Sequence, residues 1–285
     1  MILIASGIQR HESTHWYKRD GTPFYEVIAK GNGQPRSATL RDARPVGAVP
    51  SFSTVNAILD KPNLNGWKVE QGILAALTAP HLPGETLTEF AARCAQDAAD
   101  VSIKAADFGT AVHDAIESFI GGALESPRPD VVKFVEAFKG WYDAHIQELR
   151  GCIVDWKTQG KQTLDALAPW DDWCRQLAAY RAGAAVAGTL PETADPLTEQ
   201  TFADLDHGYG GKLDFLWRRM ANQDIGALVL VNVLISSAVP GLIKIHRWPE
   251  PEAEKQLDIF KHTLALWKIL KGYDASTFGK EMAAC

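Results

Sequence analysis

The spacing of apolar residues divides the chain into a helical first half and a strand-rich second half. Apolar positions recur every three or four residues in three stretches, which predicts helices there. These stretches are 85–106, 110–120 and 131–149. The segment 51–77 is also predicted to be helical, with Ser53 or Thr54 as its cap and an interruption at Pro62. A helical part is therefore expected over residues 51–150.

Short apolar runs bounded by glycine and proline predict strands in the second half. The predicted strands are 152–157, two within 198–217 around the turn 207–211, 227–237 and 242–248. The last two flank the sequence AVPG, which favours a hairpin. A helix is predicted over 170–187 and a loop over 188–197. We therefore expect a sheet core over residues 151–248.

The two ends of the chain have different patterns. Residues 1–50 are rich in loop formers and include a predicted hairpin with Asp20-Gly21 as its turn. Residues 250–272 predict an amphipathic helix that ends at Gly272. Its inward positions are Leu257, Phe260, Leu264 and Trp267. The predicted fold class is α/β, with a small mixed sheet flanked by helices in a domain over residues 51–285 and a hairpin and loop region before it.

Composition narrows the class of protein. The chain has 285 residues, 46% hydrophobic and 22% charged, as in ordinary globular proteins. No apolar run reaches the roughly 18 residues of a membrane span, and the N-terminal apolar patch lacks the basic lead-in of a secretion signal. A cytoplasmic location is the default expectation. The net charge of −6 does not favour nucleic-acid binding, although a local basic groove can serve it. The four scattered cysteines predict free, mostly buried thiols rather than a disulfide framework or a zinc ribbon.

The sequence GCIVDWKTQG (151–160) places an acid and a lysine two residues apart in a predicted strand. Because side chains alternate along a strand, Asp155 and Lys157 are expected on one face, opposite Val154 and Trp156. A second acid, Asp214, follows the glycines of GYGGKLDFLW. Two carboxylates on adjacent strands repel each other unless a divalent cation lies between them. Such an ion could hold a phosphate oxygen and activate a bound water, with Lys157 orienting the water or neutralising phosphate charge.

Two further pairs of polar residues share helical faces. His113 and Glu117 lie one turn apart in GTAVHDAIESF, in a helix expected to begin near Thr110. Gln176 and Tyr180 are spaced in the same way in QLAAY. These two side chains could hydrogen-bond phosphates or support the strand that carries the lysine. Each pair alone is also common in ordinary packed helices.

The four segments together carry a family resemblance. GTAVHDAIE, GYGGKLDFL, IVDWKTQGK and QLAAYRAGA resemble the motifs of the RecB-type branch of the PD-(D/E)XK nuclease superfamily. The N-terminal part, with HWYKRDG, and the segment NVLISSAVPGLIKIHRW resemble phage exonucleases of that branch. The resemblance covers most of the chain. It implies a restriction-endonuclease-like core and a DNA exonuclease that depends on Mg²⁺ or Mn²⁺ and hydrolyses phosphodiester bonds at DNA ends during phage recombination and repair.

The resemblance also implies a role for each matched residue. Asp214 and Asp155 would be metal ligands together with His113, and Lys157 would be the catalytic lysine. Gln176 and Tyr180 would bind substrate or support the active-site strand, and Glu117 is an additional candidate. The implied partners are DNA and a single-strand annealing protein of phage recombination in a bacterial host cell. Ring-forming exonucleases occur in the superfamily, which leaves a homo-oligomer open, and no membrane partner is expected.

The order of the motifs departs from the family pattern. In relatives the acid strand precedes the D-x-K strand, whereas here Asp155 and Lys157 come before Asp214. The expected strand order is therefore permuted. Neighbouring strands can be joined in either order when their connections are long enough, so a permuted chain could rebuild the same site.

Other functions compete with the nuclease. His11-Glu-Ser-Thr-His15 fits the H-E-x-x-H pattern of zinc proteases, but it lies outside any predicted helix and has no third ligand at a recognisable spacing. A catalytically inactive nucleic-acid-binding protein of the same fold is the closer alternative. The iron–sulfur nucleases of the superfamily cluster three cysteines near the C-terminus, where this chain has only Cys285, so no cluster is expected.

The N-terminal region offers a candidate DNA-binding surface. It combines arginines with the aromatic residues Trp16, Tyr17 and Tyr25, which could stack on a base at a DNA end. The same aromatic residues could instead form a local hydrophobic cluster, and core packing is the favoured interpretation.

Overall fold

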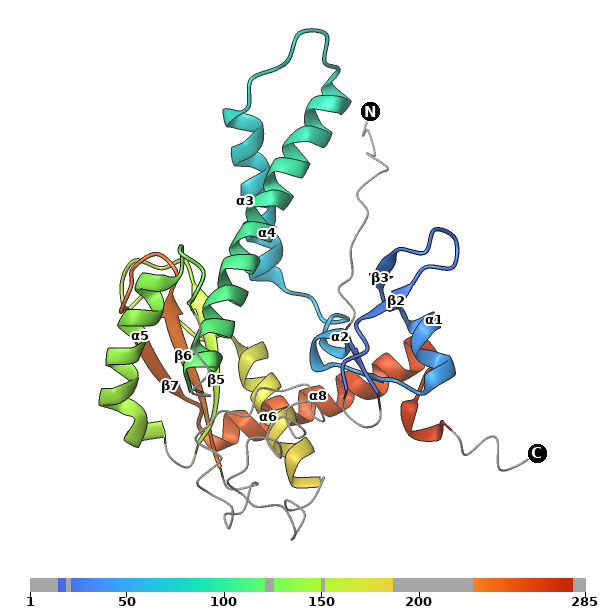
Figure 1. Cartoon of the computed structure of the whole chain (residues 1–285). Coiled ribbons are helices and arrows are strands. Elements are labelled where there is room, and N and C mark those ends of the chain that lie inside the picture. The colour runs from blue at the N-terminus through green and yellow to red at the C-terminus, as the bar shows by residue number, and fades with distance from the viewer. Residues whose placement is uncertain (1–14, 19–21, 121–125, 150–151, 187–227, 279–285) are drawn as a thin grey trace, which may run out of the picture.

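A computed structural model describes residues 15–18, 22–120, 126–149, 152–186 and 228–278. Helices surround a three-stranded sheet, so the fold is α/β, as predicted (Figure 1). The elements of the first half are β1 (Trp16–Tyr17), β2 (Glu26–Ile28), β3 (Pro35–Ser37), α1 (Leu40–Ala43), η1 (Arg44–Val46), β4 (Val49–Pro50), α2 (Phe52–Asn56), α3 (Pro62–Thr78) and α4 (Leu87–Ile120). Those of the second half are α5 (Val132–His145), η2 (Ile146–Leu149), β5 (Cys152–Gln159), α6 (Asp171–Val186), β6 (Val229–Ser236), β7 (Ile243–Arg247), α8 (Glu250–Lys271) and η5 (Ala275–Thr277).

The central sheet has the strand order β5-β6-β7. β5 and β6 are parallel, and β6 and β7 form the antiparallel hairpin predicted around AVPG. The register aligns Asp155 of β5 with Asn232 of β6, and Asn232 with His246 of β7. Because paired residues on neighbouring strands point to the same face, these three polar residues form one row across the sheet. The predicted strands within 198–217 lie outside the described residues.

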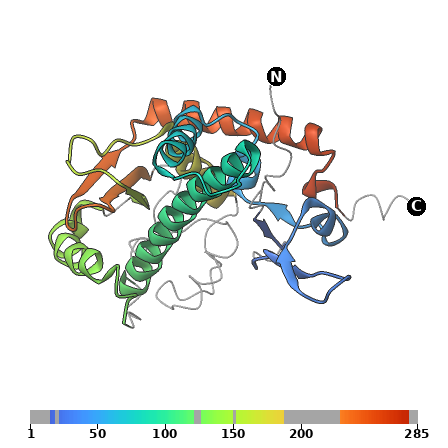
Figure 2. The same cartoon turned by 90° about the horizontal axis from the view of Figure 1, so that it is seen from above.

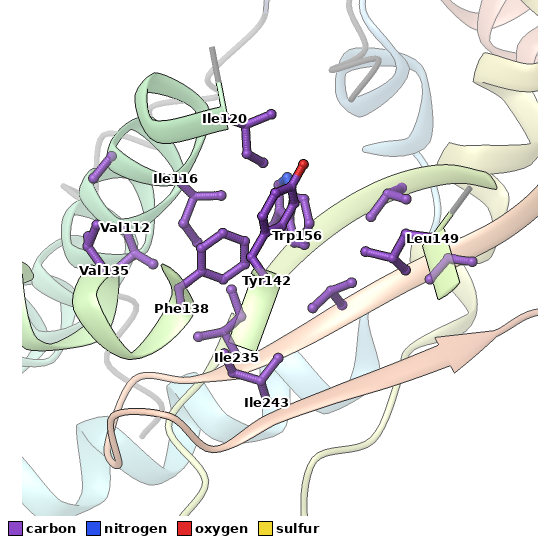
Figure 3. Close-up of a cluster of buried hydrophobic side chains, with 14 of the residues drawn as sticks. Val112, Ile116, Ile120, Val135, Phe138, Tyr142, Leu149, Trp156, Ile235 and Ile243 are labelled. Atoms are coloured by element: carbon purple, nitrogen blue, oxygen red, sulfur yellow. The ribbon is translucent and has the colours of Figure 1, made fainter. Parts of the chain in front are cut away.

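One face of the sheet is covered by α4 and α5. Val154 and Trp156 of β5 point into this core, as the alternation predicts, and the ring of Phe138 meets the ring of Trp156 edge-on at 5.1 Å (Figure 3). Val112 and Ile116 of α4 complete the cluster from the helix side. These side chains are almost fully buried, which makes this face the larger apolar core of the described structure.

The sequence predicted two separate helices over 85–106 and 110–120, the second beginning near Thr110. This prediction is wrong, because α4 is one helix of 34 residues that continues through Gly109. The glycine marks a close contact rather than a break. A Cβ atom at position 109 would lie 2.8 Å from Oγ1 of Thr158, so the absence of a side chain lets α4 approach β5.

The other face of the sheet is covered by α6 and α8. Its apolar core includes Ile153 of β5, Leu177 of α6 and Ala253 of α8. The helix α8 is capped by Gly272, which adopts the left-handed conformation (φ 54°), as predicted for a helix C-terminus. This face also holds the polar row that begins at Asp155.

Beyond the sheet, α8 continues along the N-terminal region (Figures 1 and 2). There β1 pairs with β4 and β2 pairs with β3. Trp16 is 1% exposed and packs against Trp267 and Tyr273, while the hydroxyl of Tyr25 donates to that of Tyr17 (2.6 Å). The favoured interpretation of core packing is therefore confirmed for Trp16. The predicted turn at Asp20-Gly21 lies outside the described residues.

The predicted helix over 51–77 is two helices, as the interruption at Pro62 indicated. The cap, however, is Ser51, so the prediction of Ser53 or Thr54 is wrong. The Oγ of Ser51 accepts a hydrogen bond from the backbone N–H of Thr54 (3.1 Å), which places Thr54 within the first turn rather than before it. Pro62 begins α3, where its missing N–H costs no helical hydrogen bond.

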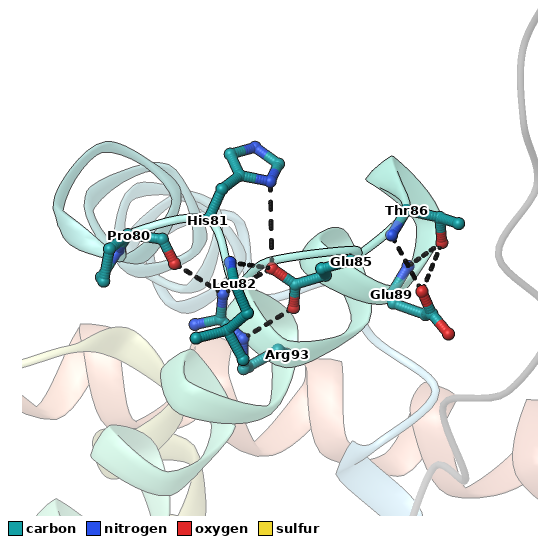
Figure 4. Close-up of polar contacts among 7 residues, drawn as sticks. All are labelled: Pro80, His81, Leu82, Glu85, Thr86, Glu89 and Arg93. Carbon is teal, nitrogen blue, oxygen red and sulfur yellow. Dashed lines mark hydrogen bonds and ion pairs between the residues drawn. The ribbon is translucent and has the colours of Figure 1, made fainter.

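The helices α3 and α4 form a hairpin that projects away from the sheet (Figure 1). Its tip is held by Arg93, which donates to both carboxylate oxygens of Glu85 (2.9 and 2.8 Å; Figure 4). Glu89 accepts from the hydroxyl and N–H of Thr86 (2.8 and 2.9 Å). The Arg93 guanidinium lowers the pKa of Glu85 to about 2. The loop between the two helices is thus fixed by charged hydrogen bonds.

No helix among the described residues has the length and apolar character to cross a membrane. Cys94, Cys152 and Cys174 are buried thiols outside any disulfide, as predicted for the cysteines in the described ranges. Burial raises the pKa of Cys174 to about 12 and also raises that of Cys152.

Candidate functional site

The candidate site is built on β5. Asp155 and Lys157 point to the α6 side of the strand, opposite Val154 and Trp156, as alternation requires. Asp155 is 4% exposed, and its Oδ2 lies 2.9 Å from Nζ of Lys157. A buried carboxylate is costly unless it is paired and hydrogen-bonded, and the lysine supplies the opposite charge. The D-x-K spacing therefore forms a direct ion pair on one face of the strand.

The ammonium of Lys157 has two further contacts. It donates to Oε1 of Gln176 (3.0 Å), and it lies 5.9 Å from the ring centroid of Trp173. Both residues come from α6. The lysine is thereby held between a carboxylate, an amide oxygen and the face of an aromatic ring, each of which favours a positive charge.

Gln176 and Tyr180 lie one turn apart on α6 and are in direct contact. Nε2 of Gln176 donates to the hydroxyl of Tyr180 (2.6 Å), while Oε1 accepts from Lys157. Since the amide is oriented at both ends, the Gln176 side chain has one arrangement that satisfies all three residues. The structure thus joins four of the predicted site residues, Asp155, Lys157, Gln176 and Tyr180, into one hydrogen-bonded chain.

The position of α6 is fixed by polar contacts to α2, to α8 and to the residue before β6. Arg175 donates to Oε1 of Gln256 on α8 and to Oδ1 of Asn56 on α2 (both 3.0 Å). Burial lowers the pKa of Arg175. Arg181 forms an ion pair with Glu250 and donates to the backbone oxygen of Leu228 (3.0 Å). These contacts set the position of the helix that carries Gln176.

Asp155 has a second partner that sequence analysis did not identify. Nδ2 of Asn232 donates to Oδ2 of Asp155 (3.0 Å), and Oδ1 of Asn232 accepts from Nε1 of Trp248 (2.7 Å). Asn232 is fully buried. Because both Lys157 and Asn232 bind Oδ2, the described residues give no hydrogen bond to Oδ1 of Asp155. Within the described ranges the carboxylate is therefore held through Oδ2.

A signal for Asn232 exists in the sequence. It is the only amide in the apolar run ALVLVNVLIS, and an amide in a buried strand must find hydrogen-bond partners. The next residue of the row, His246, packs edge-on against Trp248 at 4.4 Å, and burial lowers its pKa. Within the row Asp155 is the acid, and Asn232 links it to Trp248.

His113 and Glu117 lie one turn apart on α4 and are partly buried, within the single long helix described above. Their neighbours Val112 and Ile116 pack on the Trp156 face of the sheet, opposite Asp155. In the described residues β5 is the edge strand of its sheet. A side chain from α4 would therefore approach Asp155 around the outer edge of β5 rather than through the sheet.

Asp214, the predicted second acid, lies outside the described residues. Within the described ranges, no group of three or more histidine, cysteine, aspartate or glutamate side chains is placed to hold a metal ion. Asp155 offers one carboxylate oxygen, Oδ1, of the kind that hard divalent cations prefer. The metal site proposed from the sequence therefore combines Asp155 and His113 with Asp214, which lies outside the described ranges.

The H-E-x-x-H segment is described only at its last residue. His15 lies in the chain directly before β1, and its backbone N–H donates to Oγ1 of Thr54 (2.9 Å). His11 and Glu12 lie outside the described residues. Zinc proteases need this motif within a helix, and the position of His15 before a strand argues against one here.

The comparisons with known proteins give no family: no family model, curated protein or solved structure matches the chain. The geometry around Lys157 therefore carries the functional argument.

Proposed function

We propose that the protein is a metal-dependent DNA exonuclease that hydrolyses phosphodiester bonds at DNA ends, of the phage recombination and repair type. The observation that supports it most is the ammonium of Lys157, held 2.9 Å from Asp155 and 3.0 Å from Gln176. Hydrolysis of a phosphodiester needs a carboxylate for a hard cation and a positive charge beside the phosphate. The D-x-K strand combines both within one ion pair.

In the proposed site Asp155 would bind a cation through Oδ1. In the proposed site Asp214 and His113 complete the ligand set, and Glu117 is an additional candidate on the same face of α4 as His113. A bound Mg²⁺ or Mn²⁺ would supply Lewis-acid stabilisation of phosphate charge. Asn232 would keep Oδ2 occupied so that Oδ1 keeps a single orientation.

Lys157 would hold the phosphate and its attacking water by charge and hydrogen bonding. The Gln176 amide, which is fixed by Tyr180, holds the ammonium of the Lys157 side chain close to Asp155. A lysine side chain is flexible, so three fixed contacts reduce the entropy lost when substrate binds. Gln176 and Tyr180 would thus act on substrate through the lysine, and each has polar atoms for a phosphate.

The experiment compares linear and circular DNA with Mg²⁺, with Mn²⁺ and with EDTA. Only linear DNA with a metal ion is expected to lose nucleotides. Asp214→Ala and Lys157→Ala are expected to abolish the loss, whereas Lys161→Ala removes an exposed lysine close to β5 and serves as the matched control. Full activity of the Lys157 variant would remove this residue from the proposed chemistry.

One observation favours a second candidate, a nucleic-acid-binding protein without catalysis. The charge of Asp155 is already neutralised by Lys157, so the described site is satisfied without a cation. Such a protein would bind DNA with equal affinity in Mg²⁺ and EDTA and release no nucleotides. The same experiment therefore separates the two functions.

A further inference from the structure

A stacked pair of tryptophans lies next to the candidate site. Trp170 directly precedes α6, and its backbone oxygen accepts from the N–H of Trp173 in the first turn (2.9 Å). The two rings are stacked, with centroids 4.9 Å apart and planes inclined by 26°. Trp170 is 40% exposed, and the other tryptophans of the described residues are buried or half-buried. A large aromatic surface is therefore presented to solvent at the start of α6.

The tryptophan pair lies next to Lys157 of the candidate site. Trp173 lies between Trp170, with which it stacks, and Lys157, whose Nζ is 5.9 Å from its ring centroid. A phosphate held by the ammonium would thus have an aromatic surface beside it. Phosphate and base of one nucleotide are the two groups that such an arrangement can bind together.

The chain that carries Trp170 is fixed to the sheet. The side-chain amide of Gln159 donates to the backbone oxygen of Ala168 (2.8 Å) and accepts from its N–H (3.2 Å). Nζ of Lys244 donates to the backbone oxygen of Leu167 (2.9 Å), whose side chain is fully buried. Trp170 is therefore ordered before any ligand arrives, which lowers the entropic cost of stacking.

The charges around the two tryptophans favour a base over a phosphate as the group bound at Trp170. Asp171 and Asp172 follow Trp170 directly, and Lys61 lies 3.6 Å from Asp172 as its ion-pair partner. Carboxylates repel the DNA backbone, so the phosphates belong on the Lys157 side of the pair. A neutral ring can approach Trp170 without this penalty.

We propose that Trp170 stacks on an unpaired nucleobase at a DNA end, while the phosphate next to that base lies at Lys157. The identity of the ligand rests on the proposed function. Within a duplex both faces of each base are covered by their neighbours, whereas an unpaired base has a free face. One exposed indole also matches a single base rather than a base pair. The site therefore takes a single-stranded or frayed end.

The test measures binding of two labelled probes by fluorescence anisotropy with Ca²⁺ present. One probe is a short oligothymidylate, and the other has the same length and charge but abasic sugars. The unmodified protein is expected to bind the base-bearing probe about tenfold more tightly, the size of one stacking contact. Trp170→Ala is expected to abolish this preference and Trp170→Phe to retain part of it. Leu164→Ala, which removes an exposed apolar side chain from the same loop, is expected to leave it unchanged.

Equal affinity of the unmodified protein for the two probes would overturn the proposal. So would a base preference that survives in Trp170→Ala, or equal binding of a blunt duplex and the single strand. Release of nucleotides from linear DNA, measured in parallel with Mg²⁺, tests the proposed function separately. Cleavage without base preference would remove only the stacking site, and base preference without cleavage would remove only the nuclease.

Discussion

The two faces of β5 are buried to a similar degree but by different means. On one face Val154 and Trp156 are covered by the apolar side chains of α4 and α5. On the other, Ile153 lies in a smaller apolar core, and Asp155 and Lys157 lie beyond it under α6. The first face is stabilised by the removal of apolar area from water, which needs no particular pairing. The second is stable only while each polar group keeps its partner.

This difference indicates where stability and chemistry reside in the molecule. A packed apolar face loses stability when side-chain volume changes, whereas a polar face tolerates changes at its exposed end better than at its buried end. Lys157 and Trp170 lie at the accessible end, and Asn232 and Trp248 lie at the buried end. Variants on the two faces should therefore separate loss of folding from loss of activity.

The largest effect is expected in the apolar core. Phe138→Ala removes a fully buried ring that packs on Trp156, and the cavity should lower the free energy of unfolding by about 4 kcal/mol. Urea unfolding followed by tryptophan fluorescence measures it. Tyr180→Phe keeps the volume of a half-buried side chain on the other face and should change stability by less than about 1 kcal/mol. A similar loss in both variants would contradict the comparison.

The next effect concerns activity rather than folding. Lys157→Ala should lower the rate of nucleotide release from linear DNA by about a hundredfold or more, because no other described cation contacts Asp155. Initial rates with Mg²⁺ measure it, and thermal unfolding checks that the variant is folded. A rate within about threefold of the unmodified protein would place the chemistry elsewhere.

Substitutions at the buried end of the polar face should lower the free energy of unfolding. Asn232→Leu leaves Nε1 of Trp248 without an acceptor and removes one donor from Asp155, which should cost about 2 kcal/mol. Adding Trp248→Phe removes the unsatisfied N–H and should recover part of the loss. Additive losses in the double variant, measured by urea unfolding, would show that the two side chains act independently.

The smallest expected effect is a pH dependence from Cys174, which lies on the α6 side. Burial, reinforced by Glu252 and Asp171, raises the pKa of this thiol from about 9 in the unfolded chain to about 12. The unfolded state therefore loses its proton first, and stability present below pH 9 falls as the pH rises toward 12. At pH 10 this contributes a loss of about 1 kcal/mol.

Comparison with Cys174→Ala isolates that contribution. The variant should show a smaller fall in the free energy of unfolding between pH 8 and pH 10. An identical fall in both proteins would show that other groups account for the whole alkaline dependence.

The sequence predicted local structure well where a periodic pattern coincided with a clear end signal. The hairpin of β6 and β7 and the termination of α8 at Gly272 are confirmed because glycine, proline and alternation agree at those positions. The continuity of α4 was missed because a glycine that serves a tertiary contact looks like a break when only neighbours in sequence are considered.

The candidate site was predictable in the part that depends on short spacing. D-x-K and Q-x-x-x-Y fix which side chains share a strand face or a helix face, and the structure joins them. Asn232 and Trp173 depend on how β6 and α6 are placed against β5, which local periodicity does not determine. The metal-ligand roles of Asp214, Asp155 and His113 stay predictions.

The position of α8 has a consequence for how the chain folds during synthesis. Trp16 is covered by Trp267, the hydroxyl of Tyr273 donates to the backbone oxygen of Ala48, and Arg44 donates to the backbone oxygen of Gly272. Residues 16–48 leave the ribosome before α8 and can complete their core only after α8 has emerged. Until then the N-terminal aromatic residues stay exposed to solvent or to a chaperone. Contacts that join opposite ends of the chain should also make folding slow.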